Sequence, residues 1–209
     1  MLLYKSVLKY GEAEKTIEKS RFIAHVRPVD SYDGARSFVS EIKEKYRDAT
    51  HNVPAIICGD KQEMCWASDD GEPQGTSGGP MLKVATDAGL TYLALVVTRY
   101  FGGIKLGTGG LVRAYTDLAK AGIEAAGICE VRDSVKIFYR VDYRFSDKIK
   151  NAVKTLPYTM GDAVYTDKIE IPLACETENE AAMRRFMEDM TSGTAEISAE
   201  EKSLIRIPI

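Results

Sequence analysis

The segment TYLALVVTRYFGGIKLGTGGLVR, residues 91–113, decides the fold class of this chain. Residues 91–99 are rich in aliphatic and β-branched side chains, which is typical of a buried strand. Five glycines follow, and after them Leu111, Tyr115 and Leu118 recur on one face of a helix. A strand therefore leads through a glycine-rich loop into a helix that packs on a sheet, which predicts an α+β fold.

The preceding residues predict further strands of that sheet and a second helix. Residues 1–30 alternate between apolar and polar side chains, as antiparallel strands do. Residues 31–46 carry an apolar stripe with helical spacing behind the cap candidate Ser31. Residues 53–58 and 63–67 are short strand-like runs joined by a turn, so they predict a β-hairpin.

The carboxy-terminal third of the chain predicts a second domain of alternating strands and helices. Its predicted elements are, in order, strand 135–143, helix 146–156, strands 158–165 and 168–174, helix 178–190 and strand 196–208. The order βαββαβ is that of a ferredoxin-like fold. Thr177 and Glu180 have the spacing of a capping box before the second helix. We therefore expect two domains, residues 1–130 and residues 131–209.

The composition is that of an ordinary globular protein with little excess charge. The 209 residues carry a net charge of -3, and the pI is about 5.6. These values exclude a polybasic protein whose affinity for nucleic acid comes from general phosphate attraction. Any contact with nucleic acid must therefore be local.

The sequence carries no pattern typical of secretion or membrane insertion. Charged residues Lys5 and Glu12 interrupt the first residues too early for a signal peptide. No apolar run reaches the roughly 18 residues that a membrane-spanning helix needs. Four scattered cysteines form no C-x-x-C pair: Cys58, Cys65, Cys129 and Cys175. We expect a cytoplasmic protein without membrane contact, whose thiols are reduced and mostly buried.

The first candidate site is the acidic loop SDDGEPQGTSGGP, residues 68–80. Asp69, Asp70 and Glu72 place three carboxylates within four residues. Such a group suits a hard cation or acid–base chemistry, whereas Asp and Gly also serve turns that only shape the backbone. His51 either assists these carboxylates as a base or ligand, or caps the end of the preceding helix. We assign these four residues to a partner or ligand contact, with no metal, no cofactor and no catalytic residue.

The second candidate site is the glycine-rich segment itself. Its cations lie in a stretch without acidic residues, and its glycines precede a helix amino terminus, a geometry that favours anions. The aromatic residues beside the cations suit stacking on single-stranded bases, although close backbone packing explains the glycines equally well. The spacing matches neither a P-loop nor a dinucleotide-binding motif. The predicted nucleic-acid or anion-binding residues are Arg99, Tyr100, Phe101, Gly102, Gly103, Lys105, Gly107, Gly109, Gly110 and Arg113.

Four motifs together resemble one known family. They are KSRFIA at residues 19–24, ATHN at 49–52, SDDGEP at 68–73 and VTRYFGGIKLG at 97–107. In this order and spacing they resemble the IMPACT/YigZ family over roughly residues 19–127, and the expected ferredoxin-like tail makes the chain similar to the bacterial type of that family. The resemblance implies an amino-terminal domain similar to the second domain of a small-subunit ribosomal protein. It also implies a ferredoxin-like second domain similar to one in elongation factor G.

The resemblance gives three functional hypotheses. Eukaryotic members regulate translation through an amino-acid-starvation kinase pathway, and this kinase role is not carried over because the chain lacks their additional amino-terminal domain. Both expected domains resemble parts of the translation machinery, which favours a regulator that contacts structured RNA or the ribosome. The alternatives are a metal-assisted hydrolase or phosphotransfer enzyme that uses Asp69, Asp70 and Glu72, and a protein-interaction regulator without nucleic-acid affinity. The sequence predicts neither the partner nor the oligomeric state.

Overall fold

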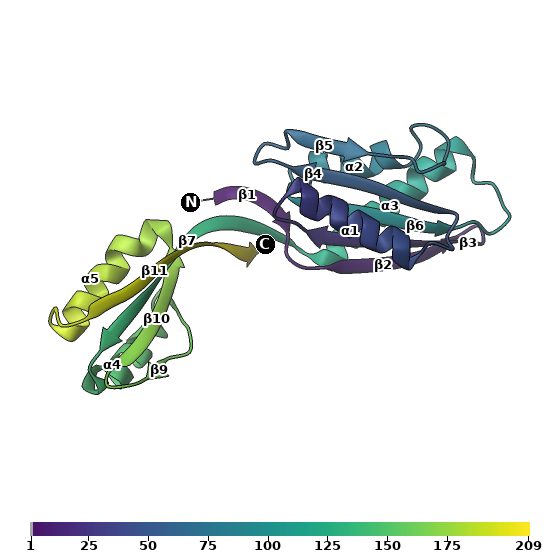
Figure 1. Cartoon of the computed structure of the whole chain (residues 1–209). Coiled ribbons are helices and arrows are strands. Elements are labelled where there is room, and N and C mark those ends of the chain that lie inside the picture. The colour runs from purple at the N-terminus through teal and green to yellow at the C-terminus, as the bar shows by residue number, and fades with distance from the viewer. Residues whose placement is uncertain (1) are drawn as a thin grey trace. The chain divides into compact units, whose positions relative to one another are not determined.

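A computed structural model describes residues 2–209, which form two compact units (Figure 1). The larger unit contains residues 4–130 and the last four residues, 206–209. The smaller unit contains residues 131–205 together with Leu2 and Leu3. No helix within residues 2–209 combines the length and apolarity that crossing a membrane requires.

The larger unit is built on a five-stranded antiparallel sheet with helices on both faces. The strand order is β2 (Gly11–Ile17), β3 (Ser20–Pro28), β6 (Leu93–Tyr100), β4 (His51–Cys58) and β5 (Met64–Ala67). Helix α1 (Tyr32–Lys45) covers one face, and α2 (Gly78–Asp87) and α3 (Gly107–Ala126) cover the other (Figure 1). Ser31 caps α1 by accepting the N–H of Gly34, as predicted.

The central strand β6 shows why its residues 93–97 are all apolar. Leu93, Leu95 and Val97 pack into the core beneath α2 and α3, whereas Ala94 and Val96 pack beneath α1. Side chains alternate between the two faces of a strand, so a strand covered on both faces needs no polar positions. The predicted buried strand at residues 91–99 is therefore confirmed.

The smaller unit has the predicted ferredoxin-like order of elements. In chain order they are β7 (Ile128–Val141), α4 (Tyr143–Val153), β8 (Thr159–Met160), β9 (Val164–Tyr165), β10 (Ile169–Glu176), α5 (Glu180–Thr191) and β11 (Glu196–Pro208). Strand β7 pairs with β10 and with β11, β10 also pairs with the short strands β8 and β9, and β1 (Leu2–Val7) joins the same sheet beside β7. The apolar faces of α4 and α5 enclose a separate core that includes Ile149 and Met187.

Three local predictions differ from the structure. The strand predicted at 158–165 is split into β8 and β9, because the register against β10 shifts by one residue between Met160 and Val164. Helix α3 begins at Gly107, so three of the predicted loop glycines form its first turn. No capping box forms at Thr177, which lies in a 3-10 turn, and the Glu180 carboxylate pairs with Arg184 of α5.

The cysteines are free, as expected. Cys58, Cys129 and Cys175 are buried, and Cys65 of the edge strand β5 is exposed. Burial raises the pKa of the Cys65 thiol and, to about 11, that of Cys175. Neither thiol therefore resembles an activated nucleophile, which requires a lowered pKa.

Candidate functional site

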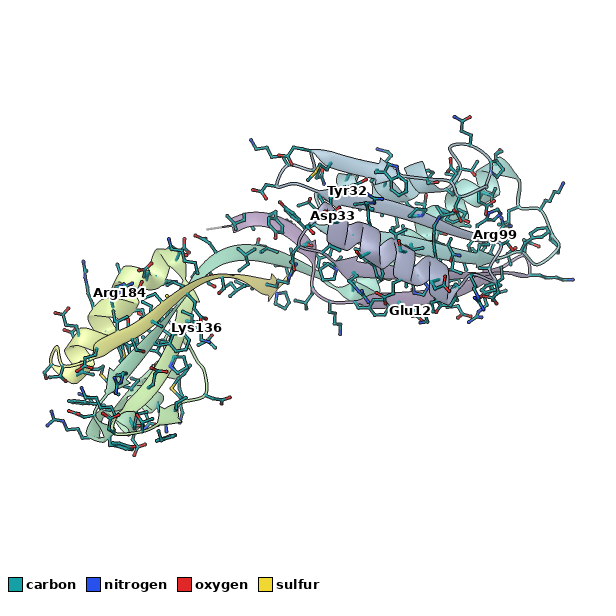
Figure 2. All side chains as sticks on the ribbon, viewed as in Figure 1. Glu12, Tyr32, Asp33, Arg99, Lys136 and Arg184 are labelled. Atoms are coloured by element: carbon teal, nitrogen blue, oxygen red, sulfur yellow. The ribbon has the colours of Figure 1, made fainter. Side chains whose placement is uncertain are left out.

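The two candidate segments of the sequence line one pocket, here called the glycine-loop pocket. Its volume is about 420 Å³, and it is lined by Thr50, His51, Gly71, Glu72, Pro73, Arg99, Phe101, Lys105, Leu106, Gly107, Thr108 and Leu111. The antiparallel pairing of β4 and β6 sets His51 opposite Arg99, at the end of the sheet where β6 meets the glycine-rich loop (Figure 2). The fold thus joins residues that are far apart in the sequence.

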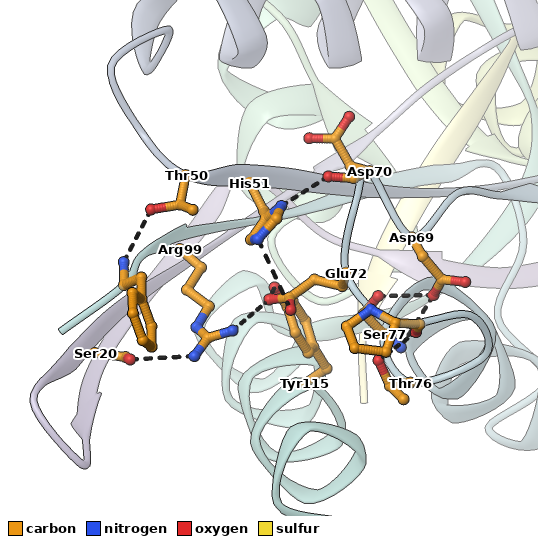
Figure 3. A network of polar contacts seen from close by, with 12 residues as sticks. Ser20, Thr50, His51, Asp69, Asp70, Glu72, Thr76, Ser77, Arg99 and Tyr115 are labelled. Carbon is orange, nitrogen blue, oxygen red and sulfur yellow. Dashed lines mark hydrogen bonds and ion pairs between the residues drawn. The ribbon is translucent and has the colours of Figure 1, made fainter. Parts of the chain in front are cut away.

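A buried ion pair forms the base of the site. Nη1 of Arg99 lies 2.7 Å from Oε1 of Glu72, and the two side chains are only 5% and 3% exposed. The hydroxyl of Tyr115 donates to the same carboxylate oxygen at 2.7 Å (Figure 3). Burial and the negative charge of Glu72 raise the pKa of Tyr115, so the phenol remains a donor. The charge of Arg99 is therefore balanced inside the protein.

Asp69 organises the acidic loop from within. Its carboxylate accepts hydrogen bonds from the backbone N–H groups of Gly75, Ser77 and Gly78 and from the Ser77 hydroxyl. Burial pushes the pKa of Asp69 upward, but these hydrogen bonds outweigh it, and the net pKa is lowered. Asp69 therefore shapes the backbone of its own loop, as Asp residues do in structural turns.

Asp70 and His51 form a second internal set of contacts. The Asp70 carboxylate accepts the N–H of Asn52 at 2.7 Å and pairs with Lys43. Nδ1 of His51 lies 2.8 Å from the backbone oxygen of Asp70, and a carbonyl oxygen only accepts, so Nδ1 carries the proton. Nε2 of His51 lies 3.8 Å from Oε2 of Glu72.

These contacts separate the three carboxylates from one another. Figure 3 shows the carboxylates of Asp69 and Asp70 directed away from that of Glu72. Among residues 2–209 no three His, Cys, Asp or Glu side chains are grouped so that they could hold a metal ion. Of the acidic residues, only Glu72 lines the pocket.

The glycines of the second segment have two different roles. A Cβ atom on Gly102 would lie 1.9 Å from the backbone oxygen of Lys19, so this glycine permits close backbone packing. Gly103 and Gly107 have φ values of +86° and +70°, which favour glycine. A Cβ on Gly109 would meet nothing within 4 Å, so packing does not explain it. Gly110 lies next to it in the first turn of α3.

The first turn of α3 is open to the pocket. Its N-cap residue is Leu106, and within residues 2–209 no side-chain cap hydrogen bond is made to its first amides. Gly107 and Thr108 of this turn line the pocket together with Lys105. Uncapped amides and the helix dipole give this end a partial positive charge.

The aromatic and basic residues of the segment are placed differently from one another. Phe101 is 45% exposed and lines the pocket, whereas the hydroxyl of Tyr100 donates to Asp48 outside it. Lys105 and Arg113 are exposed and have no ion pair within residues 2–209, but only Lys105 lines the pocket. Nε of Arg113 donates to the backbone oxygen of Gly109.

Sequence reasoning did not assign to the site three residues that hold it in place, Tyr115, Ser20 and Thr50. Tyr115 was placed on the buried stripe of α3, where its hydroxyl implies a buried hydrogen-bond acceptor. Ser20 accepts hydrogen bonds from Arg99 and from the N–H of Gly102. The hydroxyl of Thr50 accepts the N–H of Phe101. Ser20 and Thr50 lie in the motifs KSRFIA and ATHN, and Tyr115 lies on the predicted buried stripe, but their contacts with the site come from the fold.

Comparison with known proteins places the chain in a family. The profile of the Impact N-terminal domain matches residues 18–123. Over 199 residues the chain is 38% identical to the IMPACT family member YvyE of Bacillus subtilis, which covers 95% of this chain and 91% of YvyE. The chain belongs to the IMPACT family. The resemblance found in the sequence is thereby confirmed.

Two other relatives match less than half of the chain, whereas a second family profile and a solved structure extend the similarity to the smaller unit. The IMPACT family member YigZ of Escherichia coli is 45% identical over 101 residues, 47% of this chain and 50% of YigZ. Rat Protein IMPACT is 37% identical over 97 residues, 44% of this chain and 30% of the rat protein. A domain of unknown function, DUF1949, matches residues 140–194 of this IMPACT family chain. A solved crystal structure of a hypothetical protein covers 94% of this chain and 97% of its own, with a TM-score of 0.61 and 27% identity.

Proposed function

We propose that this chain is a translation-associated regulatory protein that contacts structured RNA or the ribosome at the glycine-loop pocket. Membership of the IMPACT family supports the regulatory role, because the family resemblance connects eukaryotic members with translational control. The ferredoxin-like unit, similar to one in elongation factor G, also fits a ribosomal partner. The observation that carries the proposal is the combination, in one pocket, of exposed Phe101, unpaired Lys105 and the uncapped start of α3.

These three features match the physical needs of single-stranded RNA or an unpaired loop. An exposed aromatic ring offers a surface on which a base can stack. Lys105, Arg113 and the amides of α3 supply local positive charge, although the chain as a whole has a net charge of -3. Arg99 contributes little to this charge, because Glu72 neutralises it.

The test is sedimentation of the full chain with ribosomes and with total RNA across a salt series. The double variant Lys105→Gln/Arg113→Gln is compared with Lys9→Gln/Lys61→Gln, which removes two other exposed charges of the larger unit. We expect the first variant to bind more weakly and to reduce the salt slope by about 1 per lost phosphate contact, and the second to bind like the wild type. Equal binding of both variants at every salt concentration would contradict the proposal.

A metal-assisted enzyme is less well supported. The acidic loop and the glycine-rich loop do line one pocket, as that hypothesis requires. However, Asp69 and Asp70 use their carboxylates inside the protein, so the expected oxygen ligands do not converge.

A protein-interaction regulator is favoured by one separate feature. Met64 and Trp66 are exposed on the edge strand β5, and exposed apolar residues at an edge are typical of protein contacts. Partner capture from lysate that survives RNase treatment, and is lost in Trp66→Ser, would support this function over RNA binding.

A further inference from the structure

The glycine-loop pocket also indicates which part of an RNA it would hold. We infer that it takes a single nucleotide unit, with the base against Phe101 and the phosphate at the start of α3 beside Lys105. This inference rests on the proposed function, and it adds a ligand class: a nucleoside monophosphate, either free or within an RNA strand.

The phosphate end is defined by charge. Glu72 and Arg99 cancel each other, so the charges that line the pocket leave the ammonium group of Lys105 in excess. Helix α3 is 20 residues long, and no side chain caps its first amides, two of which belong to the lining residues Gly107 and Thr108. A long uncapped helix and a lysine at the same point favour a phosphate over a neutral group.

The pocket wall also holds a buried donor without an acceptor. The Arg99 side chain is 5% exposed, and its Nε–H has no acceptor within residues 2–209. Buried polar groups are usually paired, so an unpaired donor in a pocket wall favours an acceptor supplied from outside the chain. Nε itself is covered, so a phosphate or carbonyl oxygen of the ligand reaches it only after the side chain of Arg99 or Phe101 shifts.

The base end is defined by Phe101. Its backbone N–H is tied to Thr50, and the guanidinium of Arg99 lies 5.4 Å from the centre of its ring. These contacts fix the ring while it stays 45% exposed. The pocket volume of about 420 Å³ is at the lower end of the roughly 300–1,000 Å³ found for small-molecule sites. This size suits one nucleotide and not a stacked duplex.

The test is calorimetric titration of the full chain with AMP, adenosine and inorganic phosphate. We expect AMP to bind at least about 10-fold more tightly than adenosine or phosphate, because only AMP occupies both ends of the pocket. Lys105→Gln and Phe101→Leu should each weaken AMP binding about 10-fold. Lys61→Gln, which removes an exposed charge away from the pocket, should leave it unchanged. The circular dichroism spectrum of each variant establishes that it is folded.

Each other outcome overturns the inference. If AMP binds no more tightly than phosphate, the pocket is only an anion site. If Lys105→Gln and Phe101→Leu bind AMP like the wild type, the nucleotide lies elsewhere. A total absence of AMP binding, together with salt-sensitive RNA binding, would refute this inference and leave the proposed function standing.

A competition experiment separates the two sources of the nucleotide. A short RNA with a 5′-phosphate is bound to the chain, and AMP is then added. Displacement of the RNA by AMP places both in one pocket and supports a nucleotide from an RNA strand. AMP binding without any binding of RNA or ribosomes would keep the inference, with a free nucleotide as ligand, and would refute the proposed function.

Discussion

Glu72 connects three parts of the larger unit through one carboxylate. It binds Arg99 of β6 and Tyr115 of α3, and it lies beside His51 of β4. Because both charges of the ion pair are buried, the pair gains little net stability from its formation but is costly to break. A single substitution at this position therefore acts on the fold and on the pocket together.

The first prediction concerns this buried pair. Glu72→Gln leaves the guanidinium of Arg99 without its counter-charge, so we expect the free energy of unfolding to fall by about 3–5 kcal/mol. Urea denaturation followed by circular dichroism measures the change. The matched control is Glu14→Gln, which breaks an exposed pair with Arg21 and should have little effect. If both variants lost the same free energy of unfolding, burial of the Glu72–Arg99 pair would not be the cause of the destabilisation.

The second prediction concerns pH and His25. This ring is fully buried, and burial is the main reason that its pKa falls from the usual 6.5 to about 4. The charge of Lys45 lowers this pKa further, and the charge of Glu12 raises it; both effects are smaller than that of burial. Between these pH values the unfolded chain binds the proton and the folded chain does not, so stability falls as the pH drops from 6.5 toward 4. Urea midpoints at pH 7 and pH 4.5 should differ less in His25→Gln than in the wild type. An unchanged difference would show that other groups, such as carboxylates, cause the acid sensitivity.

Individual residues of the site were only partly predictable from the sequence. Glu72, Phe101 and Lys105 were identified, because carboxylate clusters and aromatic residues beside cations are uncommon outside sites. The neutralisation of Arg99 could not be predicted, because its partner Glu72 is 27 residues away in the sequence. Tyr115, which binds the same carboxylate, is 43 residues from Glu72. The packing of α3 and of the acidic loop against the sheet brings these three groups together.

At the scale of elements, the segment between β6 and α3 combines close packing with an open helix end. Gly102 lies against the backbone of Lys19, at the turn between β2 and β3, while Gly109 faces open space. Close backbone packing therefore requires glycine at position 102, whereas at position 109 it does not.

The third prediction uses this pair of glycines. Gly102→Ala forces a Cβ atom into the backbone of Lys19, and we expect a loss of about 1–3 kcal/mol in stability. Gly109→Ala adds a methyl group in open space and improves helix propensity, so we expect a gain of about 0.5–1 kcal/mol. Thermal unfolding of the two variants beside the wild type provides the measurement. A loss of stability in Gly109→Ala would mean that this position also needs glycine for packing.

Elements were predictable wherever one periodicity extended over the whole segment. The stripe of α1 gave its helix almost residue for residue, whereas residues 1–30 were predicted only as antiparallel strands without bounds. The start of α3 was not predictable, because its first turn contains three glycines, which disfavour a helix interior. The break between β8 and β9 was missed for a different reason: a one-residue register shift leaves the composition of the segment unchanged.

The whole molecule contains separate hydrophobic cores in its two units. Leu118 belongs to the core beneath α2 and α3, and Leu173 to the core of the ferredoxin-like unit. We propose that the domain boundary lies near residue 130, as the sequence predicts. Domains with their own cores usually open as separate cooperative units.

The fourth prediction tests this division by hydrogen exchange. Leu118→Ala should destabilise its own core by about 2–5 kcal/mol and speed up amide exchange within residues 4–130. Leu173→Ala should do the same within residues 131–205. Mass spectrometry of peptides from both variants gives the exchange rates. Faster exchange throughout the chain in both variants would show that the chain unfolds as one unit.

The uneven exposure of the four thiols has a practical consequence. A maleimide dye in excess should attach to the folded protein at one position, Cys65, and to the denatured protein at four. The number of dye labels in intact-mass spectra then reports how many of the buried cysteines have reacted. Cys58 and Cys175 lie in different units, so digestion after labelling reveals which half of the chain opened first.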